Sequence, residues 1–459
     1  MGRSRGATVV GVVLAVAIST VSCSGDEAAP GVEATGRVDW EWVADCPPDV
    51  ESEVVPEHVC GWIDAPLGGG EQELFVVVIE PSEPSDESPI LETGTDLGMA
   101  PNYAGLAPIA QRTGRRTVIV ALPGTGHSVP SLDCPGVDDL GDVPTDDPDL
   151  LQAIEQCRDL LDEQGVDPAL MTPVASVPAL TAVMDAIHDG EWVLMGHGTT
   201  GAAAVEIARA DPDRIEALVL DTPVQRDDDW PARRAAIIAG SAEVCRANDY
   251  CTATHGDVRK LWRAAVRRAS TRPVEMPRGG LDPALLERGL RWLVALDGVA
   301  PVPAMLAEAA TGQKSIQLWD LHIALDEAPP LCVGWLPKCR SRAQMVLGAA
   351  LSSVCPTGAG GPAFVQACRR WGVEEPQLAA GEPLVGVPTL ALLGDHDPYA
   401  DPDEAAEVVR EWVPDAHVVV VPQQGHNVLG EDCVRLMRNV WLAGNHDQPP
   451  PPLACPGVR

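Results

Sequence analysis

The sequence predicts an α/β protein whose mostly parallel sheet is covered by helices on both faces. Short apolar runs rich in β-branched residues alternate with amphipathic helix patterns before residue 223, and the alternation resumes after residue 386. Such alternation is typical of parallel sheets, because each crossover helix buries its apolar stripe on the sheet. The third observation is a glycine-dense turn at residues 196–201, set directly between a strand pattern and a helix pattern.

Each predicted element follows from its residue pattern. Runs of β-branched and other apolar residues predict strands, and apolar residues that recur every three or four positions predict helices. In chain order, strands are predicted at residues 74–79, 89–94, 117–121, 192–195, 215–220, 388–393 and 417–421, and helices at residues 106–111, 150–164, 177–188, 202–210, 404–413 and 432–442.

Residues 224–385 interrupt this alternation. They hold six tryptophans, six cysteines and only helical patterns, with no strand pattern. We predict a helical, disulfide-bearing lid inserted after the sixth strand, with most tryptophans packed between its helices. The lid would divide the α/β core into segments 38–223 and 386–459. Its helical patterns lie at residues 231–247, 257–269, 283–296, 302–310, 316–325 and 342–347.

The turn at residues 196–201 has the features of a nucleophile elbow, a sharp strand-to-helix turn that exposes a catalytic side chain. Its central position is Gly198, where a hydrolase carries serine, and Thr200 stands where the pattern has glycine. Thr199 follows the centre, so its backbone N–H is expected to face an oxyanion hole. His197 is expected to be a packed or solvated side chain rather than a base.

Two later loops supply a candidate acid and a candidate histidine. Asp397 lies in the run Gly-Asp-His-Asp-Pro after one predicted strand, and His426 follows the next strand in the run Gln-Gln-Gly-His. The carboxyl ends of parallel strands share one edge of a sheet, so the elbow, Asp397 and His426 should meet there. An aspartate in that place orients the histidine and stabilises its charged form. His396, beside Asp397, is expected to face solvent.

Several short motifs carry a family resemblance. They are Cys60-Gly-Trp62, Gly124-Thr-Gly-His-Ser128, Pro130-Ser-Leu-Asp-Cys-Pro135, Val219-Leu-Asp-Thr-Pro223, Gly394-x-x-Asp397-Pro398 and Gly425-His426. On these residues the chain resembles the secreted tripeptidyl aminopeptidase branch of the α/β-hydrolases, related to proline iminopeptidases. The resemblance implies an exported hydrolase that removes short peptides from free N-termini beneath a disulfide-bearing lid. It matches Asp397 to the catalytic acid, His426 to the base and Gly198 to the serine position.

The sequence departs from that family at two places. The serine is replaced by Gly198, and Leu-Glu-Thr-Gly-Thr-Asp-Leu-Gly at residues 91–98 replaces the Gly-Gly-Pro-Gly loop that the family uses near its oxyanion hole. Asp96 in this loop would oppose a developing oxyanion. The two losses favour a pseudoenzyme that binds a peptide or another small ligand. Two alternatives stay open: an active serine-independent peptidase or esterase that uses Thr199 or a water activated by His426, and a structural envelope protein with no ligand.

The beginning of the chain predicts export. Arg3 and Arg5 precede an apolar stretch at residues 7–18 that is too short to span a bilayer comfortably, and Cys23 follows a lipobox-like Thr-Val-Ser. We therefore predict a signal peptide at residues 1–22 and a lipid-anchored tether at residues 23–37, with Cys23 as the lipidated residue. The protein would then sit on the outer face of a bacterial cytoplasmic membrane; simple secretion is the alternative.

Twelve cysteines remain besides Cys23, and an even number in an exported chain predicts disulfides. None has Cys-x-x-Cys spacing, so neither a metal site nor another cofactor is expected. The expected neighbouring pairs are Cys46–Cys60, Cys134–Cys157, Cys245–Cys251 and Cys433–Cys455, whereas Cys332, Cys339, Cys355 and Cys368 allow three connectivities.

The net charge of −35 argues against nucleic acid and anionic membrane surfaces as partners. Contact with a membrane is expected only through the lipid anchor. Solubility of an exported protein is the simplest explanation of the charge, and the sequence leaves the oligomeric state open.

Overall fold

The computed structural model describes residues 40–43, 46–48, 50, 57–67, 70–83, 85–94, 101, 103–132, 134, 148–223, 229–276, 279–312, 347–355, 361–373, 381–444, 446, 448–453 and 455. Several sequence predictions fall outside these residues. They concern the signal peptide and tether with Cys23, Asp96, the helical pattern at residues 316–325, the pattern at residues 342–347 apart from its last residue, and Cys332 and Cys339.

A nine-stranded sheet forms the centre of the molecule, in the order β1-β2-β3-β5-β4-β6-β7-β10-β11. Neighbours from β1 to β5 pair antiparallel, and all neighbours from β5 to β11 pair parallel. The strands are β1 (Trp40–Val43), β2 (His58–Leu67), β3 (Gly70–Ile79), β4 (Ile90–Glu92), β5 (Thr117–Val120), β6 (Trp192–His197), β7 (Ile215–Asp221), β10 (Thr389–Gly394) and β11 (His417–Val421).

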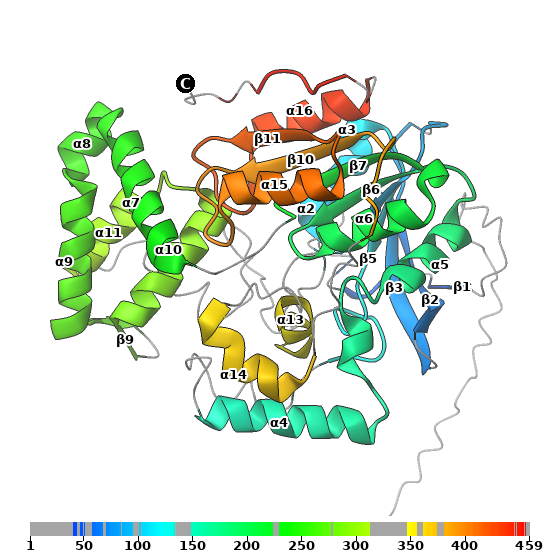
Figure 1. Ribbon diagram of the computed structural model, residues 1–459, viewed down its shortest axis with the longest axis horizontal. Coiled ribbons are helices and arrows are strands. Elements are labelled where there is room, and N and C mark those ends of the chain that lie inside the picture. Colours follow the sequence, from blue (N-terminus) through cyan, green and yellow to red (C-terminus); the bar gives the residue numbers. More distant parts are fainter. Residues whose placement is uncertain are drawn as a thin grey trace, which may run out of the picture. The chain divides into compact units, whose positions relative to one another are not determined.

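Helices cover both faces of this sheet, as the sequence predicts (Figure 1). Helices α5 (Val177–Ile187), α6 (Thr200–Ala210) and α15 (Pro402–Trp412) bury their apolar sides against one face. Helices α3 (Pro108–Thr113) and α16 (Asp432–Leu442) pack on the other, together with the short α2 (Tyr103–Leu106). Successive residues of one strand enter opposite cores, which explains why residues 74–79 of β3 and 192–195 of β6 are continuous apolar runs.

The predicted strands and the core helices that flank them are confirmed, with ends that coincide or shift by up to four residues. The strands β1 and β2 were not among the predictions, and they place the insertion after β7, the seventh strand, rather than the sixth. The expectation that the insertion contains no strand is wrong. Strands β8 (Val274–Met276) and β9 (Gly279–Leu281) form a short antiparallel hairpin there, too short for a periodic signal.

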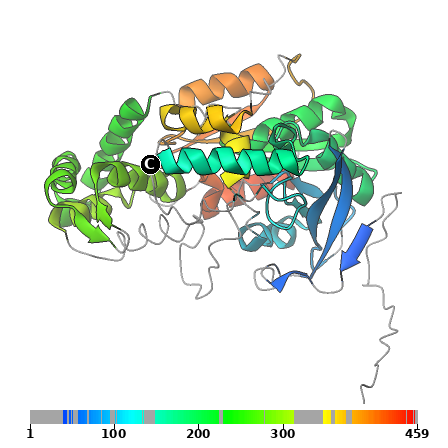
Figure 2. The same ribbon diagram turned by 90° about the horizontal axis from the view of Figure 1, so that it is seen from below.

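The helices of the insertion form two separate apolar cores. One core joins α7 (Trp230–Arg246), α9 (Val258–Thr271), α10 (Pro283–Asp297) and α11 (Val302–Thr311), with α8 (Asp249–His255) tied to α7 by a disulfide. In the other, α13 (Leu347–Val354) and α14 (Gly361–Trp371) pack with α4 (Pro148–Glu163), which precedes the elbow in the chain. Figure 2 shows α4 running alongside the yellow α13 and α14. Trp371 is fully buried in this second core, as predicted for the tryptophans.

Five disulfides connect described residues. All four expected neighbouring pairs are confirmed. Among the lid cysteines, Cys355 is bonded to Cys368. The only described group of potential metal ligands is Cys46, His58 and Cys60, and its two cysteines are joined in a disulfide. In the described part of the chain, no helix combines the length and apolar character needed to cross a membrane.

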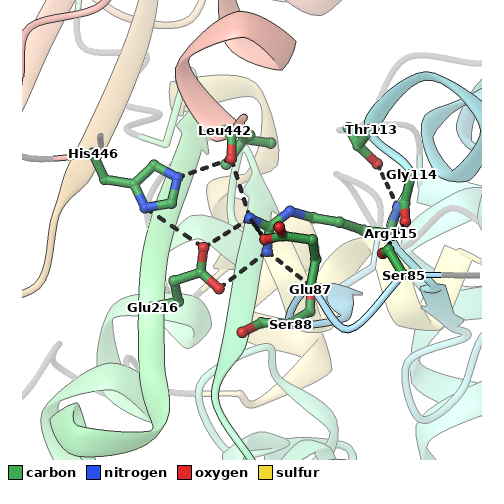
Figure 3. A network of polar contacts seen from close by, with 9 residues as sticks. All are labelled: Ser85, Glu87, Ser88, Thr113, Gly114, Arg115, Glu216, Leu442 and His446. Atoms are coloured by element: carbon green, nitrogen blue, oxygen red, sulfur yellow. Dashed lines mark hydrogen bonds and ion pairs between the residues drawn. The ribbon is translucent and has the colours of Figure 1, made fainter. Parts of the chain in front are cut away.

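A buried arginine connects three distant segments at the edge opposite the elbow (Figure 3). Arg115, only 2% exposed, donates two hydrogen bonds to Glu216 at the start of β7, at 3.0 and 2.8 Å. Its Nη2 also donates to the Leu442 carbonyl at the end of α16 and to Glu87. Nε2 of His446 donates to the same Leu442 carbonyl, 3.0 Å away. The network therefore fixes the last helix against the sheet.

We predict that Arg115→Gln lowers the free energy of unfolding by about 3 kcal/mol, because it leaves the Glu216 carboxylate without its buried counter-charge. Arg116→Gln is the matched control. That neighbour forms a half-buried ion pair with Glu80, and its loss should cost at most about 1 kcal/mol. Urea unfolding measures both. Equal losses in the two variants would contradict the role given to Arg115.

The same network predicts acid sensitivity. Burial raises the pKa of Glu216, but the hydrogen bonds from Arg115 and Ser88 and the charges of Arg115 and His446 outweigh it, so the pKa lies below its ordinary value. Because the pKa of Glu216 is lower in the folded state, its ionised carboxylate stabilises the fold at any pH above the unfolded-state pKa. This stabilisation is lost as the pH falls through the folded-state pKa. The stability difference between the wild type and Glu216→Gln should therefore be full at pH 7 and shrink below about pH 4.5.

Candidate functional site

The turn between β6 and α6 is built on close backbone contact. A Cβ placed on Gly196 would lie 2.7 Å from the Gly201 Cα, and one on Gly201 would lie 2.5 Å from the Pro223 Cβ. Neither position can carry a side chain without moving backbone. Gly198 at the centre has φ +49°, and its N–H donates to the Asp221 carbonyl at 2.9 Å. This is the left-handed centre that the elbow pattern predicts, although Gly198 is buried.

The hydrogen bonds of Thr200 explain why the turn accepts a threonine at this position, where the pattern has glycine. Its side chain is fully buried, accepts a hydrogen bond from the His197 N–H at 3.0 Å, and donates to the His197 and Gly94 carbonyls at 2.9 and 3.2 Å. The hydroxyl thus closes the turn from inside. It also joins the elbow to Gly94, within the predicted oxyanion loop at residues 91–98.

The acid and the histidine are in contact. His426 Nδ1 lies 2.8 Å from Asp397 Oδ2, and the other oxygen of Asp397 accepts from the Tyr399 N–H at 2.8 Å. Tyr399 packs edge-on against the His426 ring at 5.0 Å between centroids, and the Thr222 hydroxyl donates to the His426 carbonyl. Asp397 is 6% exposed, so the pair is both oriented and largely shielded from water.

A cavity of about 220 Å³ brings the elbow and the histidine together. Gly198 and His426 both line it, and so do Trp292, Ala295 and Leu296 from α10 of the insertion. Backbone bonds hold α10 over the histidine loop, because the Asn427 N–H donates to the Ala295 carbonyl and the Val299 N–H donates to the Gln423 carbonyl. The insertion therefore covers the site. The role of Trp292 in lining the cavity is not apparent from its helical pattern.

His197 is packed behind the elbow, one of the two placements expected for it, and it belongs there to a cluster of buried charges. Its Nδ1 lies 3.0 Å from Asp221 and its Nε2 lies 3.2 Å from Glu92, which is fully buried. Burial lowers the pKa of His197, but the charge of Glu92 and the contacts with both carboxylates raise it to about 10. Burial likewise raises the pKa of Glu92, and Arg438 supplies a further positive charge nearby.

Other predicted residues fall outside the cavity lining. Thr199 is 3% exposed and, in the described part of the site, does not line the cavity. Ser128 is structural, as expected, since its hydroxyl accepts from the Phe75 N–H and donates to the Ala121 carbonyl. The expectation that His396 faces solvent is wrong. Its ring bonds to Asp395 and packs against Gly240 of α7, because the insertion covers this loop.

The strand order, the elbow between β6 and α6, and the Asp397–His426 pair after β10 and β11 define an α/β-hydrolase fold. A family model described as "TAP-like protein" matches residues 359–448, which include Asp397 and His426.

Individual relatives share only parts of the chain or little sequence. Lipase LipV of Mycobacterium tuberculosis is 47% identical over 49 residues, which are 11% of this chain and 19% of that protein, so the chain matches about a fifth of that relative's length. Naproxen esterase from Bacillus subtilis is 14% identical with a TM-score of 0.36, over 85% of this chain and 93% of that one. Proline iminopeptidase of Mycobacterium smegmatis is 16% identical with a TM-score of 0.36, over 84% and 98%.

We predict that His197→Gln destabilises the protein by about 3–5 kcal/mol at pH 6, because it leaves the buried carboxylates of Glu92 and Asp221 without their shared cation. Because the pKa of His197 is higher in the folded state, its charge stabilises the fold fully below pH 6.5, the unfolded-state pKa. This stabilisation is lost as the pH rises through the folded-state pKa of about 10. The stability difference from the wild type should therefore shrink between pH 6.5 and pH 10. His255→Gln, on α8, is the control. A difference that stays constant with pH would contradict a charged His197.

Proposed function

We propose that this protein is an exported binding protein built on an α/β-hydrolase fold, a pseudoenzyme that holds a peptide or another small ligand in the hydrolase cavity. One observation carries the proposal. Gly198 lines the cavity at the centre of the elbow, beside His426, and offers no side-chain nucleophile. The acid, the histidine and the covering helix α10 are all in place around it.

The missing nucleophile limits the chemistry severely. Removing the serine from a working triad leaves only about 10³–10⁴-fold acceleration over water, supplied by binding and the oxyanion hole. Such a rate is far below that of a peptidase. The cavity and its cover, by contrast, suit the retention of a small ligand.

Export and anchoring belong to the same proposal. The basic and apolar beginning of the chain and the lipobox-like residues before Cys23 support a lipid-anchored protein on the outer face of a bacterial cytoplasmic membrane, or else a secreted one. The five disulfides support an oxidising compartment. The similarity to a TAP-like family supports peptides as one class of ligand.

A second candidate is a serine-independent hydrolase. The short Asp397–His426 contact favours it, because an oriented histidine can take a proton from a bound water. Thr199 is a poorer nucleophile candidate, since its side chain is buried and lies outside the described cavity lining.

Hydrolysis of peptide p-nitroanilides by purified wild type, Gly198→Ser and Gly198→Ala tests the proposal. We expect no detectable hydrolysis by the wild type or the alanine variant. The serine variant should hydrolyse the substrate at a rate higher by roughly 10²-fold or more, the low end of what a positioned general base contributes. The alanine variant controls for the added Cβ at a positive φ, which costs about 1–2 kcal/mol.

Steady turnover by the wild type would exclude a pseudoenzyme. If His426→Ala then abolished that turnover while ligand binding survived, the second candidate would replace the first. A serine variant that binds peptide but stays silent would show that the oxyanion side of the site is lost as well, and would leave the binding function standing.

A further inference from the structure

The cavity wall is cationic, although the chain as a whole carries a net charge of −35. Among the described residues, its lining includes three arginines, two histidines and a single carboxylate. The arginines come from two helices that lie on the same face of the sheet: Arg112 from α3, and Arg435 and Arg438 from α16. A spacing of three residues places Arg435 and Arg438 on one side of α16.

Arg438 is the buried member of this group. It is 2% exposed, and its hydrogen bonds to described residues run from Nε and Nη2 to one oxygen, Oδ1 of Asn439. Burial lowers the pKa of Arg438 to about 10, the charges of Glu92 and Asp221 oppose that change, and the like charges of Arg435 and Arg112 add to it. All three arginines line one cavity, and the charges of Arg435 and Arg112 both act on Arg438; a bound anion would offset that repulsion.

The other two arginines are placed by different contacts. Arg435 donates to the Leu429 and Gly430 carbonyls and pairs with Asp432, whose carboxylate is at the surface. Arg112 is exposed in the last turn of α3. The cavity lining also contains buried donors with no hydrogen-bond partner in the described part of the protein, Nε of Arg435 and Nε1 of Trp292.

The one carboxylate of the lining already has a cationic partner. Asp221 Oδ2 is 3.0 Å from Nδ1 of His197, and Oδ1 is buried without a hydrogen-bond partner among the described residues. His197 shares its positive charge between Asp221 and Glu92. A cationic ligand would be held best by a carboxylate with free acceptor oxygens, because charge-assisted hydrogen bonds are the strong ones. This cavity presents guanidinium groups instead.

Apart from Thr222 and Asn427, the remaining lining is apolar. Leu106, Ile109, Leu296, Tyr399 and Leu429 surround the cavity together with Trp292. An anionic group at the arginine end and an apolar body along these side chains would satisfy both parts of the wall.

We propose that the cavity binds a monocarboxylate with an apolar body, its carboxylate held by Arg438, Arg435 and Arg112. This inference rests on the proposed function, because it names the ligand class of the same cavity. Two sources share this chemistry: a medium-chain fatty acid, and the free C-terminus of a short apolar peptide.

Calorimetric titration at pH 7 and low ionic strength tests the proposal with two pairs of probes. Octanoate is compared with octanamide, and acetyl-dileucine with acetyl-dileucinamide. We expect at least one acid to bind 10-fold or more tightly than its amide, with an affinity that falls as salt is added. The pair that shows the preference identifies the source.

Arg112→Gln should weaken binding of the preferred acid roughly 3- to 10-fold, because one partly solvated charge is lost. Arg410→Gln, an exposed arginine of α15 outside the cavity lining, is the matched control and should change nothing. Arg438→Lys keeps the buried charge but loses the planar fork, and should weaken binding 10-fold or more. Because Arg112 is exposed, its variant keeps the test valid even if Arg438→Lys fails to fold.

Three results would overturn the inference: equal binding of acid and amide, no binding of either acid, or an Arg112→Gln variant indistinguishable from Arg410→Gln. The proposed function fails separately. Turnover of p-nitrophenyl octanoate by the wild type at catalytic rates would exclude a pseudoenzyme and leave the carboxylate preference intact. Equal affinity of acid and amide without turnover would overturn the carboxylate preference and leave the pseudoenzyme proposal intact.

Discussion

The close approach of β6 and α6 is the constraint on which the rest of this structure depends. The two backbones meet at Gly196 and Gly201 with no room for a Cβ on either, so the chain turns sharply and holds residue 198 at a positive φ. That turn sets the position of the cavity and of everything that lines it. A glycine at the centre adopts this conformation without strain. The geometry of the elbow therefore does not depend on a side chain at residue 198.

A second constraint lies directly behind the elbow. Glu92, His197, Asp221 and Arg438 bring two acidic and two basic groups together in a region shielded from water. Isolated charges at such depth would be very unfavourable, so each depends on the others. The four residues come from β4, β6, β7 and α16, and the cluster thereby links the centre of the sheet to its last helix. His197, Asp221 and Arg438 also line the cavity, where Arg112 and Arg435 add further positive charge.

The covering helix gives the cavity its other wall. Backbone hydrogen bonds tie α10 to the loop that carries His426, so the helix and the histidine are positioned by one set of contacts. The loop that carries Asp397 is covered by α7, against which His396 packs. The insertion is thus part of the site, and a ligand in the cavity would contact the sheet edge, α16 and α10 together. The separate packing of α13 and α14 on α4 leaves this wall to the first half of the insertion.

The sequence by itself determined the fold class, the elbow, the pairing of Asp397 with His426 and four disulfides. These follow from local patterns: apolar runs, helix periodicity, a glycine-dense turn, and polar residues placed directly after strands. Strands β8 and β9 were missed because three residues carry no periodicity, and β2 because its apolar and polar residues do not alternate regularly. Only the tertiary structure decided the charge of the site. His197, Glu92 and Arg438 are ordinary polar residues in the sequence, and their cluster exists because strands and a helix from distant parts of the chain converge on one shielded point, where burial and mutual attraction set their charges.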